Sequence, residues 1–169
     1  AVTRAEPSVI SVIVSKDLPI IEECPFNPFS DLPPEFQQYF GRDFGFQFYE
    51  PCQRGTELRE VGGGSGFIIS SDGMIVTNKH VVFDDDASYT VLTNDGKRHD
   101  AEVLARDPFR DFAVLKIEAS ALPELMLGDS DEVRLGQPVI AIGNALGEFR
   151  NTVSSGVISG LARNIAASG

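Results

Sequence analysis

Residues 62–82 read GGGSGFIISSDGMIVTNKHVV, and this stretch decides how the rest of the chain is interpreted. Two short apolar runs, 67–69 and 74–76, lie on either side of Asp72 and Gly73. Asp-Gly between two such runs is typical of a β-hairpin, because glycine adopts a positive φ without steric cost. The second strand is expected to end shortly before His80. A histidine at the end of a buried strand is suited to proton transfer near neutral pH.

The other segments alternate short β-branched or apolar runs with turns and show no long helical period. Beside the hairpin, the expected strands are 8–15, 88–93, 97–105, 112–117, 139–142 and 152–161. Short strands of this kind in the first two-thirds of a chain are typical of a small antiparallel barrel, and the later strands are too few to close another one. We therefore predict an all-β protein. Its expected parts are a first barrel (1–118), a linker (119–136) and the first strands of a second barrel (137–169).

An insertion within the first barrel, at about 19–59, has a different composition. Its prolines argue against a continuous helix or a central strand, and predict a long irregular segment with a helical turn at 35–40. Aromatic residues are costly to leave in water, so we expect them to pack against another subunit or another part of the protein. The prolines include Pro25, Pro28, Pro33, Pro34 and Pro51, and the aromatic residues include Phe26, Phe29, Phe36, Phe40, Phe44, Phe46, Phe48 and Tyr49.

The two cysteines, Cys24 and Cys52, lie near the two ends of this insertion. They are either reduced thiols or a disulfide, and their position around one irregular segment favours the disulfide. Such a bond would close a loop of nearly thirty residues and add about 3–4 kcal/mol of stability on the chain-entropy model. It would also imply an oxidising compartment such as a periplasm.

Charge and composition exclude several classes of function. A net charge of −11 argues against a nucleic-acid partner, because no basic face is available for phosphates. No apolar run approaches the roughly 20 residues of a transmembrane helix, and residues 1–7 lack the apolar core of a signal peptide. The triplet Asp84, Asp85 and Asp86 lacks the spacing and the glycine of a calcium loop, so a solvated turn is expected there. No cofactor or metal motif is found.

Residues 62–82 closely resemble the catalytic-histidine region of HtrA/Deg-type serine proteases, which have the chymotrypsin fold. The resemblance continues through 111–116 (DFAVLK), 127–131 (LGDSD), 141–144 (AIGN) and 152–159 (TVSSGVIS). It implies a chymotrypsin-like antiparallel β-barrel, with the first barrel complete and the second only begun. Ala145 departs from the pattern, because family members commonly carry proline there.

The resemblance assigns the general base to His80 and the carboxylate that orients it to Asp111. Asp107 is the nearest competing carboxylate, and its place before a proline suits a turn. The other histidine, His99, sits among charged residues and is expected to be an exposed surface residue. Asp107 and His99 are therefore given structural rather than catalytic interpretations.

The nucleophile of the family lies in a GNSGGP-like segment, which these residues do not contain. Ser65 follows glycines at what is expected to be a flexible entry into a strand, and Ser154 and Ser155 lie in a β-pattern. None of the three has a nucleophile-turn signature. By itself the chain is expected to be inactive.

For the complete protein, the resemblance implies a serine endopeptidase for protein quality control, acting on unfolded or misfolded proteins. It also implies a homotrimer, C-terminal PDZ modules and a regulatory role for the insertion. A non-catalytic regulatory or chaperone-like module, binding peptides through the aromatic insertion, is the alternative. A generic ligand-binding barrel with His80 in its core is a third interpretation.

Overall fold

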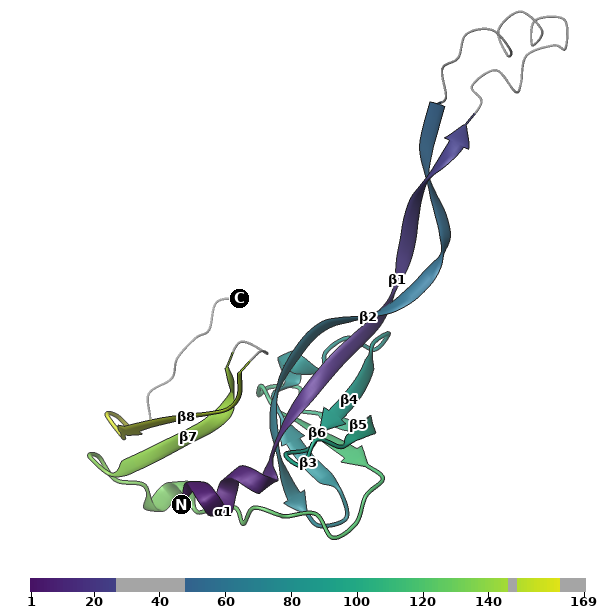
Figure 1. Ribbon diagram of the computed structural model, residues 1–169. Coiled ribbons are helices and arrows are strands. Elements are labelled where there is room, and N and C mark those ends of the chain that lie inside the picture. The colour runs from purple at the N-terminus through teal and green to yellow at the C-terminus, as the bar shows by residue number, and fades with distance from the viewer. Residues whose placement is uncertain (27–47, 146–148, 162–169) are drawn as a thin grey trace, which may run out of the picture. The chain divides into compact units, whose positions relative to one another are not determined.

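The computed structural model describes residues 1–26, 48–145 and 149–161 (Figure 1). In these ranges, no helix combines the length and the apolar character needed to cross a bilayer. The helices are α1 (Val2–Ala5) and the 3₁₀ turns η1 (Glu6–Ser8), η2 (Lys79–Val81) and η3 (Ser130–Glu132). The strands are β1 (Val9–Phe26), β2 (Phe48–Ser70), β3 (Met74–Thr77), β4 (Ser88–Leu92), β5 (Arg98–Arg106), β6 (Ala113–Ile117), β7 (Pro138–Ala145) and β8 (Phe149–Val157).

The chain divides into two compact units, one made of Ala1–Lys16 with Glu60–Gly169 and the other of Asp17–Arg59. In the first unit, strands in the order β1-β2-β3-β6-β5-β4 form a closed barrel, in which β4 pairs antiparallel with β1. Strands β7 and β8 form a separate antiparallel pair. The prediction of an all-β antiparallel fold is thus confirmed.

The barrel is filled by side chains that alternate along its strands. In β6 the burial changes at every residue, and in β3 it alternates in the same way, as expected where one face of a strand points inward. The fully buried interior consists of Ile10, Val12, Ile68, Ile75, Val82, Val91, Leu115 and Ile117. Burial of these aliphatic side chains supplies the main stabilisation of the unit.

The hairpin predicted around Asp72 and Gly73 is present as β2 and β3, which pair antiparallel. Gly73 has a φ of +101°, and a Cβ on it would collide with the carbonyl oxygen of Ile117. Its N–H donates to the carbonyl of Ser70 (3.0 Å), and its own carbonyl accepts from the N–H of Ile117 (3.0 Å). Glycine is required here because the turn both bends sharply and touches the end of β6.

The predicted irregular insertion is wrong at both of its ends, because β1 continues to Phe26 and β2 begins at Phe48. The strands pass through Pro19, Pro25 and Pro51. In a two-stranded ribbon each strand has a free outer edge, so a proline placed there removes no ladder hydrogen bond. The predicted helical turn at 35–40, and the aromatic residues between 27 and 47, lie outside the described residues.

A disulfide joins Cys24 to Cys52, as predicted, with Cα atoms 5.7 Å apart and a sequence separation of 28 residues. An ion pair between Glu22 and Arg54 (3.3 Å) lies in the same unit. The aromatic residues described there are not packed away: Phe26 is 42% exposed and Tyr49 is 51% exposed. In the described parts of this unit, 17–26 and 49–59, no residue is buried. The disulfide links its two strands covalently.

Candidate active site

His80 lies in η2, directly after the end of β3, as the sequence predicts. Two backbone hydrogen bonds form this turn, from the N–H of Val81 to the carbonyl of Asn78 (3.2 Å) and from the N–H of Val82 to the carbonyl of Lys79 (3.0 Å). The His80 side chain is 71% exposed. The imidazole is thus exposed to solvent, and its backbone is fixed by the hydrogen bonds of η2.

The register of the barrel explains why Asp111 lies beside this histidine. In the antiparallel pair of β3 and β6, Thr77 is opposite Ala113. The chain leaving β3 and the chain entering β6 therefore meet at one end of the barrel. His80 follows Thr77 by three residues and Asp111 precedes Ala113 by two, so the two side chains are brought together from positions far apart in the sequence.

Two hydrogen bonds join the residues. His80 Nδ1 lies 2.6 Å from Asp111 Oδ2, and the backbone N–H of His80 donates to Asp111 Oδ1 (2.9 Å). Both carboxylate oxygens are therefore engaged by one residue. Since an ionised carboxylate only accepts, the proton of a neutral imidazole is on Nδ1, and Nε2 carries the lone pair that can take up a proton.

The same contacts act on the charge of the carboxyl group. The pKa of Asp111 is lowered, first by the hydrogen bond from the His80 backbone N–H and then by the bond to its ring. A hydrogen bond to the ionised form stabilises that form. Asp111 is consequently ionised over the whole range in which a histidine exchanges protons.

Asp107 has the structural role that its position before proline indicates. Its Oδ1 accepts from the backbone N–H groups of Phe109 (2.8 Å) and Arg110 (2.7 Å), and these bonds lower the pKa of its carboxyl group. The backbone N–H of Asp107 donates to the carbonyl of Phe112 (3.0 Å). Asp107 therefore caps the loop that carries Asp111.

Packing of Val81 against Gly64 holds η2 on the barrel. A Cβ on Gly64 would clash with both methyl groups of Val81, which is itself 9% exposed. Residues 62–64 are part of β2, so the predicted flexible entry at this point is wrong. Gly64 lets the backbone of β2 lie close to the Val81 side chain. A run of glycines in the sequence can serve either such a close contact or a flexible segment, and it does not show which.

Gly64→Ala is expected to lower the free energy of unfolding by about 1–3 kcal/mol, because an extra methyl group overpacks the contact with Val81. Urea unfolding of the 169-residue chain measures this. The matched control is Gly62→Ala, where a Cβ meets nothing within 4 Å. If both variants unfold at the same urea concentration, Val81 does not depend on Gly64.

One further expectation needs correction. His99 is half-buried rather than exposed, and it lies on β5 opposite Val91 in the barrel ladder.

The acidic turn after η2 is open to solvent at Asp85 and Asp86. Asp84 pairs with Lys16 (2.7 Å) and Asp85 pairs with Arg106 (2.8 Å), so two of its carboxylates also link the turn to β1 and β5.

The serines considered as nucleophiles lie within strands. The carbonyl of Ser65, in β2, accepts a hydrogen bond from Thr77 Oγ1 (2.8 Å). Ser154 and Ser155, in β8, are opposite Ala141 and Ile140 of β7. None of the three is at a turn between a strand and a helix, where a nucleophile elbow would place it.

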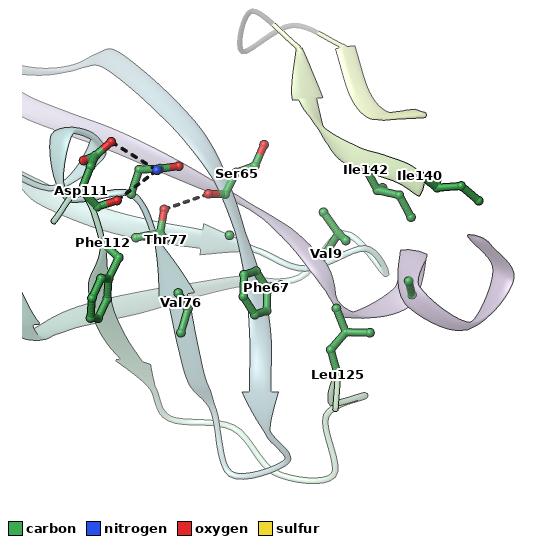
Figure 2. A pocket seen from close by; sticks show the side chains of 13 residues that line it. Val9, Ser65, Phe67, Val76, Thr77, Asp111, Phe112, Leu125, Ile140 and Ile142 are labelled. Carbon is green, nitrogen blue, oxygen red and sulfur yellow. Dashed lines mark hydrogen bonds between the residues drawn. The ribbon is translucent and has the colours of Figure 1, made fainter. Parts of the chain in front are cut away.

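A cavity of about 420 Å³ begins beside Asp111 and is mainly apolar (Figure 2). Asp111, Asn78, Thr77 and Ser65 are the polar residues of its lining. The apolar lining comes from Ala5, Val9, Phe67, Val76, Phe112, Leu125, Ile140 and Ile142. The carboxylate of Asp111 therefore lies at the border between solvent and an apolar space.

Comparison with known sequences identifies the family. Residues 64–168 match the family described as trypsin-like peptidase domain. A probable periplasmic serine endoprotease, DegP-like, from Halomonas elongata is 40% identical over 167 residues, which are 97% of this chain and 35% of that protein. A protein of the same description from Chlamydia trachomatis is 41% identical over 143 residues, covering 85% of this chain and 27% of that protein. The chain thus spans about a third of the length of these relatives.

Solved structures give the same result. The HtrA-type protease AlgW with decapeptide superposes with a TM-score of 0.67 and 34% identity, over 98% of this chain and 46% of that one. AlgW with tripeptide has a TM-score of 0.65 and 29% identity, over 98% and 40%. Together with the barrel topology and the motif around His80, these matches establish that the chain belongs to the trypsin-like peptidases, among the HtrA/DegP-type serine proteases.

Proposed function

We propose that this chain supplies the general base and the orienting carboxylate of a serine endopeptidase. His80 Nε2 accepts the proton of a serine hydroxyl and returns it to the leaving amine, while Asp111 holds the ring and stabilises the imidazolium. The observation that carries the proposal is the pair of bonds from His80 to Asp111, 2.6 Å from Nδ1 and 2.9 Å from the backbone N–H. No cofactor or metal takes part in this chemistry.

The nucleophile and the oxyanion hole are assigned to residues outside 1–169. In this proposal, residues 1–118 form a first barrel, 119–136 a linker, and 137–169 the beginning of a second barrel. Two features support the division. The pair β7–β8 has unpaired edges within the described chain, and apolar residues on it are exposed, among them Val139 (38%), Val153 (45%) and Val157 (59%). A barrel has no such edges, so further strands would cover both.

Polypeptide substrates and a periplasmic location complete the proposal. The AlgW structures contain a decapeptide or a tripeptide, and the curated relatives are described as periplasmic. The disulfide between Cys24 and Cys52 agrees with an oxidising compartment. From the family resemblance we extend the proposal to misfolded protein substrates, a homotrimer and PDZ modules.

The test is to label the full-length protein, including residues beyond Gly169, with a fluorophosphonate probe and to locate the modified residue by peptide mass spectrometry. We expect modification of one serine outside residues 1–169, and none when the 169-residue chain is treated alone. Modification of Ser65, Ser154 or Ser155 would contradict the assignment. A full-length protein that binds unfolded polypeptides but takes up no probe would instead be a non-catalytic peptide-binding module.

A further inference from the structure

The side chain of Asn78 forms a lateral contact with Asp111 that the Asp–His pair does not explain. Its Nδ2 donates to the backbone carbonyl of Asp111 (3.1 Å) and to the carboxylate oxygen Oδ2 (3.3 Å). Both bonds are drawn as dashed lines beside Asp111 in Figure 2. Both acceptors are oxygens, so the amide nitrogen, and not its oxygen, must face them.

We propose that Asn78 is a positioning residue that holds the Asp111 carboxylate in the plane required by His80. This inference rests on the proposed function and adds one residue to it. In this proposal Asn78 acts through Asp111, to which both of its bonds are made.

The need for such a contact follows from the exposure of the carboxylate. The Asp111 side chain is 49% exposed, so solvent competes for both of its oxygens. Without Asn78, both hydrogen bonds to the carboxylate would come from His80 alone. Asn78 adds a donor from the turn before η2, which fixes the backbone and the side chain of Asp111 together. A group held within a narrow range of geometry is what an efficient proton relay needs.

The two hydrogen bonds accepted by Oδ2 also stabilise the negative charge of the carboxylate. Oδ2 accepts from His80 Nδ1 and from Asn78 Nδ2, so the carboxylate is a weaker base than it would be with one donor. The bond from Asn78 is among the contacts that lower the pKa of Asp111. The imidazole proton consequently stays on Nδ1, which leaves Nε2 to accept a proton.

The neighbouring residue makes a second contact with the same loop, but not with the carboxylate. Lys79 Nζ donates to the backbone carbonyl of Asp107 (2.9 Å). Lys79 therefore fixes the path of the loop, whereas Asn78 fixes the reacting group. The charged groups near His80 in these elements are Lys79, Asp107, Arg110 and Asp111, and all of them remain in the variants described next.

The first test uses NMR titration of ring-¹⁵N histidine in the 169-residue chain, where His99 is the only other histidine and serves as the internal reference. The ring nitrogen shifts at the neutral end of the titration report which nitrogen carries the proton. In Asn78→Leu, which removes the donor, the share of His80 protonated on Nδ1 is expected to fall, because the carboxylate is no longer held beside that nitrogen. The tautomer of His99 should not change. Identical ring shifts of His80 in the two proteins would overturn the proposal.

The second test measures the rate of fluorophosphonate labelling in the full-length protein. Asn78→Leu, which keeps the size and removes the donor, is expected to slow labelling by about tenfold. The matched control is Thr77→Val, which removes the bond to Ser65 and lowers stability without touching Asp111. It should label within about twofold of the wild type. Equal losses in both variants would show a merely structural role for Asn78.

The two tests also separate this inference from the proposed function. If the wild type takes up no probe, or if it is labelled equally without His80, the proposed function fails. The NMR titration still decides whether Asn78 acts on the pair. If labelling depends on His80 but neither test responds to Asn78, only the positioning role fails.

Discussion

Replacing His80 by alanine is expected to reduce peptide hydrolysis by the full-length protein by about 10⁶-fold, the loss seen when the base of a serine-protease triad is removed. Fluorophosphonate labelling should fall below detection. The physical reason is that a neutral serine hydroxyl is a poor nucleophile unless a base takes its proton as it attacks. With His80 absent, the neighbouring cation Lys79 offers no lone pair, and it is already bonded to the loop.

The matched control is His99→Ala, which removes the other histidine of the chain. His99 lies on β5 opposite Val91, in the ladder of the barrel and not at the end that carries Asp111. Hydrolysis by this variant should stay within about threefold of the wild type once the folded fraction is taken into account. Undiminished hydrolysis by His80→Ala would end the protease interpretation of the site.

The parts of the structure that could be predicted from the sequence are those with a local signal. The turn at Gly73 needs a positive φ, and the runs beside it alternate, so the hairpin and the position of His80 follow from neighbouring residues. The family motif then selects Asp111 among many aspartates. The geometry that joins them depends on the pairing of Thr77 with Ala113, which is a long-range register that no local pattern encodes.

The structural features that the sequence does not predict depend on contacts between residues far apart in the chain. The prolines of β1 and β2 lie outside the segments that pair with β4 and β3, at 11–15 and 66–70. The sequence does not show where along a strand such pairing ends. The close contact of Gly64 with Val81 has no local signal, because the two residues become neighbours only in the folded barrel. Asn78 is polar and follows a strand, so nothing in the residue itself distinguishes a positioning contact from a turn residue.

Asp111→Asn is expected to lower the kcat/KM for peptide hydrolysis by about 10⁴-fold, with His80 intact. Asparagine presents an N–H where Oδ2 now accepts from His80 Nδ1 (2.6 Å). Two donors cannot face each other, so the ring either turns or moves its proton to Nε2. In both cases the nitrogen that faces the nucleophile no longer accepts a proton.

Asp107→Asn is the control that separates this effect from damage to the loop. Asp107 uses one oxygen, Oδ1, to accept from the N–H groups of Phe109 and Arg110, and an asparagine carbonyl can accept both bonds. The loop should therefore keep its shape, and kcat/KM should fall by no more than about threefold. Similar losses in the two variants would mean that the loop needs its overall negative charge rather than an oriented carboxylate beside His80. A large loss of kcat/KM for Asp111→Asn alone is the result that requires a carboxylate at this one position.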